Sequence, residues 1–174
     1  MNSETLFQFS LGELHPQSGR GITHTLIPQS TNHPMRTLNG GLVSSTEDIR
    51  HKYRSILMGK DLNLPPLDEV FIGKNIRIGA LVTFSRFVFQ LNPGDRVMLS
   101  RQPQEQSVRV QTMHGSPVRT HRWEEGCLVY EGVESYANVV IRYRPWLETT
   151  VVDFSFETAE ETNRTTWKII CDEL

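Results

Sequence analysis

The sequence predicts a mainly β protein, an antiparallel sandwich or partly closed barrel with one amphipathic helix and an irregular N-terminal arm. Two observations lead to this fold class. From residue 70 onward, short runs rich in Val, Ile, Phe and Thr alternate with turn signals, without a helical pattern between them. The longest apolar run, residues 76–99, contains the turn sequence Asn-Pro-Gly-Asp at residues 92–95. We therefore expect this run to form two strands joined by a tight turn at the centre of a sheet.

The first 44 residues predict an irregular arm. They contain three prolines, at positions 16, 28 and 34, among Gly, Ser, Asn and His, and their apolar positions show no sustained period. The whole chain of 174 residues is short for two domains and suits one hydrophobic core, which we expect in the rest of the chain. The predicted organisation is thus an arm over 1–44 and a single β-rich domain over 45–174.

The one predicted helix covers residues 45–58. Ser44 and Glu47 match a capping box, and Gly59 offers the left-handed stop with which many helices end. Four apolar residues recur at helical spacing, Ile49, Tyr53, Ile56 and Leu57. The opposite face carries three bases, which are either solvated or part of an anion-binding surface: Arg50, Lys52 and Arg54.

The central run, residues 76–99, changes its apolar face along its length. Apolar residues at 76, 78, 82 and 84 share one parity, and those at 87, 89 and 91 share the other. Because successive side chains of a strand point to opposite faces, this predicts a bulge or bend near Ser85 and Arg86, or burial of both faces.

Later strands follow from alternation between turns. The candidates are residues 108–113, 127–130, 139–144, 151–157 and 165–171. In the third of them, alternation predicts three residues pointing inward, Val139, Ile141 and Tyr143, and two pointing outward, Arg142 and Arg144. In the fourth, the predicted inward residues are Val152, Phe154 and Phe156.

Charge is unevenly distributed along the chain, although the net charge is only -2. Residues 1–122 carry 14 Lys and Arg against 9 Asp and Glu, whereas residues 123–174 carry 4 against 11. Arginine outnumbers lysine 14 to 4, and guanidinium suits planar, bidentate contacts with phosphate or carboxylate. The basic and acidic parts either present separate surfaces or neutralise each other within one fold.

The basic part supplies the predicted binding residues. Together with two arginines from the acidic part they are Arg77, Arg86, Arg96, Arg101, Arg109, Arg119, Arg122, Arg142 and Arg144. Such a surface would bind phosphate on RNA, on a nucleoprotein or on an anionic membrane, with affinity that falls as salt rises. It would equally suit the acidic last third of a second copy, so we expect a homo-oligomer. The sequence points to no small-molecule substrate.

The chain contains no recognisable catalytic or metal-binding pattern. Its six histidines and two cysteines match no zinc spacing, and neither a nucleophile elbow nor a phosphate loop occurs. We therefore expect no cofactor, no metal site and no enzymatic activity. A small β-sandwich hydrolase or carbohydrate-binding domain stays an alternative, because carboxylates distant in sequence can meet in a fold.

The N-terminal residues do not resemble an export signal. They carry an acid where a signal peptide has bases, and no apolar run approaches the ~20 residues that span a bilayer. We expect a cytoplasmic protein, neither secreted nor membrane-spanning, with Cys127 and Cys171 as reduced thiols.

Taken together, the Pro/Ser/His arm, the arginine-bearing run IRIGALVTFSRFVF, the lack of an export signal and the charge polarity resemble the small matrix- or coat-type structural proteins of RNA viruses. The resemblance implies a non-enzymatic assembly protein, in the host cytoplasm or the virion, that self-associates and contacts a ribonucleoprotein or a membrane. The net negative charge and the lack of a lysine-rich tail favour a matrix-like role over genome packaging. An RNA-binding module, such as a viral accessory protein, is the alternative.

Overall fold

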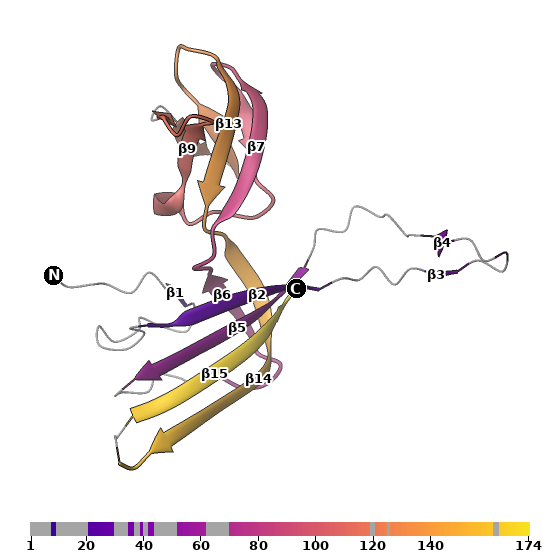
Figure 1. The fold of residues 1–174 in the computed structure, drawn as a ribbon, viewed down its shortest axis with the longest axis vertical. Coiled ribbons are helices and arrows are strands. Elements are labelled where there is room, and N and C mark those ends of the chain that lie inside the picture. The colour runs from indigo at the N-terminus through magenta and orange to yellow at the C-terminus, as the bar shows by residue number, and fades with distance from the viewer. Residues whose placement is uncertain are drawn as a thin grey trace. The chain divides into compact units, whose positions relative to one another are not determined.

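The computed structural model describes residues 8–9, 21–29, 35–36, 39, 42–43, 52–61, 70–118, 121–124, 126–161 and 164–174. Strands dominate these residues and pair antiparallel (Figure 1), which confirms the predicted mainly β class. The chain forms two compact units. We call residues 77–147 with 6–9 the smaller unit, and residues 1–5, 10–76 and 148–174 the larger unit.

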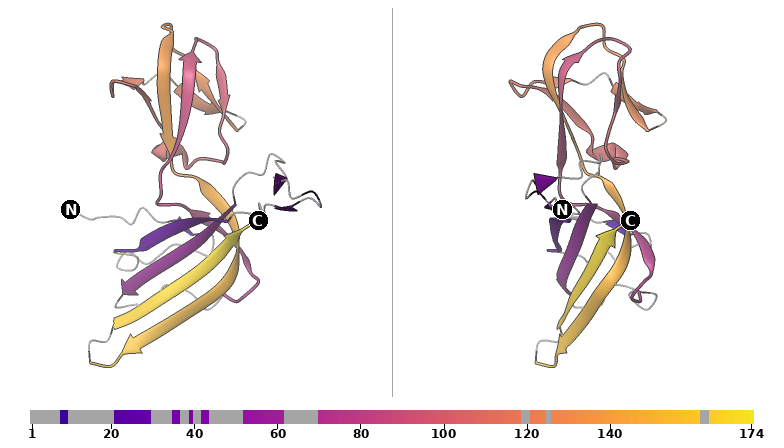
Figure 2. Two further views of the ribbon diagram at one scale, coloured as in Figure 1. Left: turned by 45° about the vertical axis from the view of Figure 1, so that its right-hand side comes forward. Right: turned by 90° about the vertical axis from the view of Figure 1, so that its right-hand side faces the viewer.

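A twisted antiparallel sheet makes up most of the described part of the larger unit. Its strands lie side by side in the order β6, β14, β15, β5 and β2 (Figures 1 and 2). Their bounds are Asn75–Gly79 for β6, Trp146–Ala159 for β14, Arg164–Glu173 for β15, Lys52–Asp61 for β5 and Thr23–Gln29 for β2. The described part of residues 1–43 also contains three short strands, namely β1 (Gln8–Phe9), which pairs with β6, and the mutually paired β3 (Met35–Arg36) and β4 (Leu42–Val43).

β2 lies inside the region that was predicted to be irregular. It pairs with β5 along its whole length, from Thr23 opposite Met58 to Gln29 opposite Lys52. Pro28 fits here because β2 is an edge strand, where a missing N–H need not cost a ladder hydrogen bond. The division into an arm over 1–44 and one domain over 45–174 stays a prediction, since most of the arm lies outside the described residues.

The predicted helix over 45–58 is wrong where the structure describes it. Residues 52–61 are strand β5, with β2 on one side and β15 on the other, while residues 44–51 lie outside the described range. The core-facing positions of β5 are Ser55, Leu57 and Gly59. Because only Leu57 is hydrophobic, the sequence did not show the alternation that predicts a strand. A Cβ on Gly59 would come within 2.5 Å of the Trp167 ring, which explains why glycine stands there.

Helical structure is scarce in the described part of the chain. It consists there of one 3-10 turn, η1 (Glu105–Ser107). No helix among those residues is long and apolar enough to cross a membrane.

The β14–β15 pair contains a bulge that changes one facing prediction. The register shifts between Val151 and Asp153, so Val151 rather than Val152 enters the core. The prediction for Val152 is therefore wrong. Phe154 and Phe156 do pair with the core residues Ile169 and Trp167, although Phe156 stays 57% exposed.

The smaller unit has two antiparallel sheets that share one core. The first has the order β10 (Pro117–Val118), β9 (Arg109–Thr112), β13 (Tyr136–Tyr143) and β7 (Phe84–Leu91). The second has the order β11 (His121–Glu124), β12 (Cys127–Tyr130) and β8 (Arg96–Met98). Both contribute to one apolar cluster, including Ile141 and Val110 from the first and Leu128 from the second. The unit is thus sandwich-like.

Within residues 76–99 the predicted tight turn between two strands is confirmed, but the predicted position at the centre of a sheet is wrong. Asp95 N–H donates to the Asn92 carbonyl at 3.0 Å, and Gly94 has a φ of +85°. The strands that the turn joins, β7 and β8, pair with β13 and β12 respectively, so the turn connects two sheets. β7 is an edge strand rather than a sheet centre.

The change of apolar face has a different cause from the predicted bulge. The β7–β13 register is unbroken through Ser85 and Arg86. The strands instead separate at residues 80–83, where the side-chain amide of the buried Gln104 donates to the Ala80 carbonyl at 2.9 Å. A break between strands resets the parity as effectively as a bulge does.

Both cysteines are free thiols, Cys127 half-buried on β12 and Cys171 buried on β15. Burial raises the pKa of the Cys171 thiol to about 12, against a smaller opposing effect of a hydrogen bond with Thr149. Cys171 is therefore protonated, and unreactive as a nucleophile, at neutral pH.

Candidate functional site

The nine arginines predicted from the basic and acidic parts all belong to the smaller unit. They are its only basic residues apart from histidine, and the sequence of the unit contains six acidic residues. Arg119 lies outside the described residues. The structure divides the other eight according to what their guanidinium groups contact.

Arg96 and Arg122 are paired with acids on the second sheet. Arg122 contacts Glu124 at 3.1 Å and Glu131 at 3.0 Å, and Arg96 contacts Glu124 at 3.6 Å. Their positive charge is therefore largely compensated within the unit.

Arg77 and Arg101 lie over aromatic rings. The Arg77 guanidinium is 4.7 Å from the Trp146 ring centre and donates to the Gln102 side-chain oxygen at 2.6 Å. Arg101 lies 5.4 Å from the Phe84 ring centre. These contacts give both arginines a role in packing.

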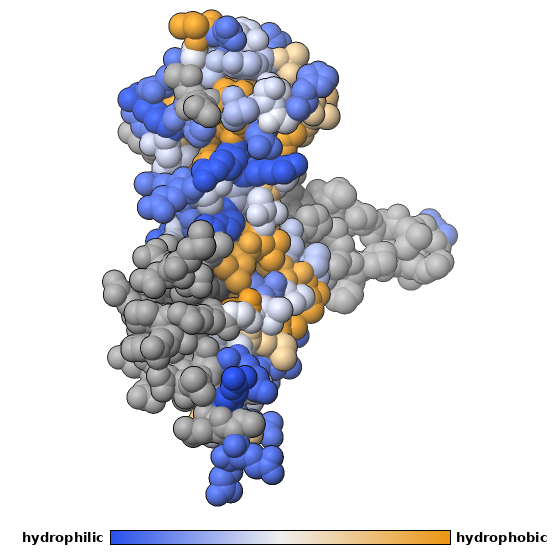
Figure 3. Space-filling view, turned by 60° about the vertical axis from the view of Figure 1, so that its left-hand side comes forward, coloured by the Kyte–Doolittle hydropathy of each residue, from blue (hydrophilic) through white to orange (hydrophobic). Residues whose placement is uncertain are grey.

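Three arginines remain together at one place, a polar hollow of about 520 Å³. The hollow is lined by Thr83, Ser85, Gln106, Ser107, Arg109, Gln111, Arg142 and Arg144. We call it the arginine pocket. Figure 3 shows one face of the molecule, on which hydrophilic side chains cover much of the smaller unit, with hydrophobic ones between them.

Strand alternation places these arginines outside the core. Val139, Ile141 and Tyr143 of β13 are buried in the core, so Arg142 and Arg144 point to the other face, as predicted. Arg142 stands directly opposite Arg109 of β9 on one side and Ser85 of β7 on the other. The pocket is thus built on the outer face of the first sheet.

The η1 turn forms the end of the pocket. The Ser107 hydroxyl donates to the Gln104 carbonyl at 2.6 Å and accepts from the Arg144 N–H at 2.9 Å. One Arg109 Nη donates to the carbonyls of Gln106 and Val108, both at 3.0 Å. These bonds fix the backbone around the pocket before any ligand enters.

The pocket has a positive charge that no described carboxylate of the unit compensates. Arg109 and Arg142 are direct cross-strand neighbours, an arrangement that destabilises a sheet when the charges are alike. In the described part of the chain, no carboxylate lies within ion-pair distance of Arg109, Arg142 or Arg144. Such a site suits a bidentate anion such as phosphate.

The described residues of the pocket lining carry hydroxyl, amide and guanidinium groups. None of these described residues is a carboxylate, histidine or cysteine, the usual groups for acid–base or nucleophilic chemistry. Elsewhere among the described residues, no three His, Cys, Asp or Glu side chains come together as around a metal ion.

Arg86 is exposed on β7, opposite Ile141. Its side chain therefore belongs to the face opposite the arginine pocket, at the edge of the sheet. It is a predicted binding residue that the structure does not bring to the pocket.

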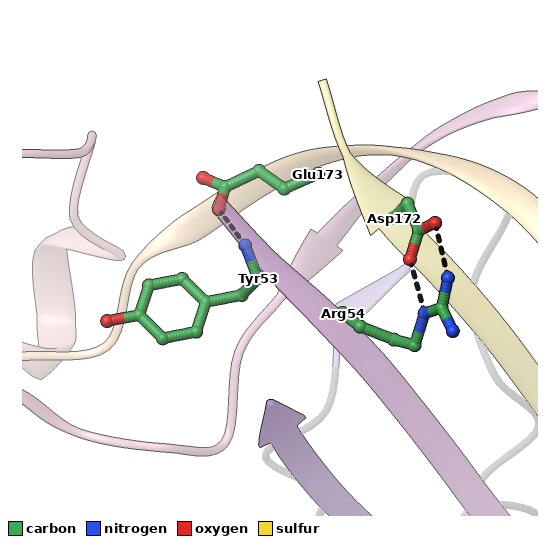
Figure 4. A network of polar contacts seen from close by, with 4 residues as sticks. All are labelled: Tyr53, Arg54, Asp172 and Glu173. Carbon is green, nitrogen blue, oxygen red and sulfur yellow. Dashed lines mark hydrogen bonds and ion pairs between the residues drawn. The ribbon is translucent and has the colours of Figure 1, made fainter. Parts of the chain in front are cut away.

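The basic residues predicted for the helix face lie in the larger unit. Arg54 makes a bidentate ion pair with Asp172 of β15, at 2.7 and 2.8 Å (Figure 4). The adjacent Tyr53 N–H donates to the Glu173 carboxylate at 2.9 Å. The hydrogen bond from Arg54 holds the pKa of Asp172 below its ordinary value. Lys52 is exposed, and Arg50 lies outside the described residues.

Several pocket residues were not predicted from the sequence. Gln111 shares the parity of Arg109 in one strand, a signal that alternation alone could have given. Ser85 enters the site through the pairing of β7 with β13, and Thr83 lies just before β7; no local pattern specifies this pairing.

Compared with known proteins, the chain matches no family model, and none of the curated proteins is significantly similar to it.

Proposed function

We propose that this chain is a non-enzymatic, matrix-like structural protein that contacts a phosphate-bearing partner, a ribonucleoprotein, through the arginine pocket. The observation that carries the proposal is the meeting of Arg109, Arg142 and Arg144 around one hollow, with no carboxylate among its described lining residues. Each guanidinium group around the hollow can offer two N–H donors to one phosphate.

The shape of the site favours discrete phosphates over a diffuse membrane surface. Attraction to anionic lipid depends mainly on the number of basic side chains near the surface. Here the bases are arginines around a hollow whose walls add three hydroxyl groups and two amides as further hydrogen-bonding groups. Those neutral groups can form directional hydrogen bonds with a phosphate inside the hollow, whereas attraction to a charged membrane surface does not depend on them.

Calorimetric titration with inorganic polyphosphate tests the pocket. We expect Arg142→Gln to weaken binding roughly tenfold or more, because a lost charge-assisted hydrogen bond costs about 1.5–3 kcal/mol. Arg164→Gln, which removes the same charge from the exposed Arg164 of β15, should leave affinity unchanged. Equal weakening by both substitutions, or no binding at low salt, would overturn the proposal, whereas anionic vesicles binding more tightly than polyphosphate would favour a membrane partner.

Self-association is a second candidate function, favoured by the separation of charge between the units. The smaller unit carries nine Lys and Arg against six acids, and the larger carries nine against fourteen. Two copies can therefore attract each other through unlike units, which is a head-to-tail contact.

Sedimentation at two ionic strengths tests this candidate. The average mass should exceed that of a monomer at low salt and fall toward it at high salt. A monomer at both salt concentrations would rule out charge-driven assembly.

A further inference from the structure

The outer face of the first sheet continues from the arginine pocket to two exposed aromatic rings. On β7, Ser85, Phe87 and Phe89 share this face, because alternate residues of a strand point the same way. Ser85 lies beside Arg142, and Phe87 lies beside Val140 of the same neighbouring strand. One half of the face is therefore basic and the other half aromatic.

The two rings are unusually accessible for phenylalanines. Phe87 is 43% exposed and Phe89 is 79% exposed. Their ring centres lie 4.9 Å apart at an interplanar angle of 86°, so one ring stands edge-on to the other. An exposed aromatic pair beside a charged site is typical of a surface that binds a partner.

We propose that the phosphate-bearing partner is a single-stranded polynucleotide, with its phosphates in the arginine pocket and its bases stacked on Phe87 and Phe89. This inference rests on the proposed function, because it names the ligand of the same pocket. A polynucleotide matches both halves of the face, since it repeats an anionic group and a flat, apolar ring along one chain.

The chemistry favours a single strand over a duplex. In a duplex the bases stack on one another, and the protein meets mainly phosphates and groove edges. The aromatic half of the face would then have no partner. Unpaired bases can stack on side-chain rings, whatever their sequence.

The dimensions of the face suit more than one nucleotide. A strand rises about 3.3 Å per residue, so Ser85 and Phe89 are separated by roughly 13 Å along β7. Backbone contacts at one end and base contacts at the other can therefore belong to successive nucleotides of one strand.

Fluorescence anisotropy with the full chain tests the inference with four probes. They are a labelled uridine oligoribonucleotide, the thymidine oligodeoxyribonucleotide of equal length, a duplex RNA and, as competitor, inorganic polyphosphate. The key variant is Phe89→Ala. Phe156→Ala serves as the matched control, because Phe156 is also exposed but belongs to the larger unit.

We expect Phe89→Ala to weaken binding of both single strands at least about fivefold, since stacking on a side-chain ring contributes about 1–3 kcal/mol per base. Binding of polyphosphate should not change. Arg142→Gln should weaken all probes and lower the salt dependence for the single strands by about 0.7 in log–log slope. Phe156→Ala should have no effect. Tighter binding of the RNA strand than of the DNA strand would support the inference and indicate a contact to the 2′-hydroxyl. Equal affinity would also support it and indicate that stacking and phosphate contacts account for the binding.

The outcomes separate this inference from the proposed function. If polyphosphate binds through Arg142 but Phe89→Ala leaves the affinity for single strands unchanged, the proposed function stands, stacking of bases on Phe89 is excluded and the further inference is overturned. If the duplex binds more tightly than both single strands, the aromatic half has no role and the inference is overturned. If no probe binds, both proposals fail. Equal thermal unfolding of Phe89→Ala and the parent chain confirms that the comparison concerns folded protein.

Discussion

At the scale of single residues, the arginine pocket combines a binding capacity with a cost in stability. Arg109 and Arg142 face each other across paired strands, without a described carboxylate close to either. Like charges in this position destabilise a sheet by about 0.2–1 kcal/mol. Two like charges in one pocket are expected at a site where a bound anion offsets their repulsion.

Arg142→Gln should therefore stabilise the free protein while it weakens anion binding. We expect the free energy of unfolding to rise by up to about 1 kcal/mol at low salt, and by less at high salt, where screening already reduces the repulsion. Thermal unfolding at two salt concentrations measures this, with Arg164→Gln as the control. A lower unfolding temperature at low salt would show that Arg142 has a stabilising contact instead.

Single-residue facing was the most predictable feature of the site. The outward positions of Arg142 and Arg144 follow from alternation with Val139, Ile141 and Tyr143. By contrast, the sequence did not show that Arg122 is paired with acids and therefore not available for a ligand. Its contact with Glu131, beside that with Glu124, depends on the pairing of β11 with β12.

At the scale of elements, β5 shows how a local pattern can mislead. Its apolar residues fit a helical stripe, but Gly59 and Ser55 occupy core-facing strand positions. The Trp167 ring of β15 fills the space above Gly59. Tertiary packing here outweighs local propensity, as it often does for short segments.

Gly59→Ala should consequently destabilise the larger unit. The added methyl group would lie 2.5 Å from the buried Trp167 ring, so the ring or the strand must move. Overpacking of this kind costs about 1–3 kcal/mol. Urea unfolding followed by tryptophan fluorescence measures the loss, and Lys60→Ala, at the exposed next position, should change stability far less. Equal effects of both variants would contradict the packing role of Gly59.

We expect His24 on the edge strand β2 to make the stability of the larger unit sensitive to mild acid. Its imidazole is hydrogen-bonded to the Ser55 hydroxyl at 3.2 Å, and burial lowers the His24 pKa from 6.5 to about 4. Between these two pH values the unfolded chain binds a proton that the folded chain does not. Lowering the pH therefore favours unfolding across this window.

We expect the parent chain to lose up to about 3 kcal/mol of stability through His24 between pH 7 and pH 4. His24→Gln should lose less over the same range, because it has no imidazole to protonate. Urea unfolding at pH 7, 6, 5 and 4 provides the comparison. Parallel pH profiles of the two proteins would show that His24 does not contribute.

At the scale of the whole molecule, stability depends on contacts between segments far apart in the sequence. Arg54 and Asp172 are 118 residues apart, yet they form a bidentate pair across β5 and β15. The hydrogen bond from Arg54 lowers the pKa of Asp172, with smaller support from the Gln29 side chain of β2. Three strands of the larger unit thus meet at one carboxylate.

Asp172→Asn should lower the unfolding temperature at neutral pH. Since the folded-state pKa of Asp172 lies below its ordinary value of 3.8, the contribution is complete above that value and disappears as the pH falls through the folded-state pKa. Calorimetric scans from pH 7 to pH 2.5 should therefore show the two proteins converging at the acidic end. A constant difference across this range would assign the loss to packing rather than to ionisation.

The sequence by itself determined the mainly β class, most strand positions after residue 100, the turn at residues 92–95 and the outward facing of Arg142 and Arg144. These features depend on alternation and turn chemistry, which act between neighbours in the chain. Only the tertiary structure decided that β5 is a strand, that β7 is a sheet edge, and that Arg109, Arg142 and Arg144 surround one hollow. Each of these depends on a partner distant in sequence, such as Trp167 above Gly59 or Arg109 opposite Arg142, and no local pattern specifies which strands will meet.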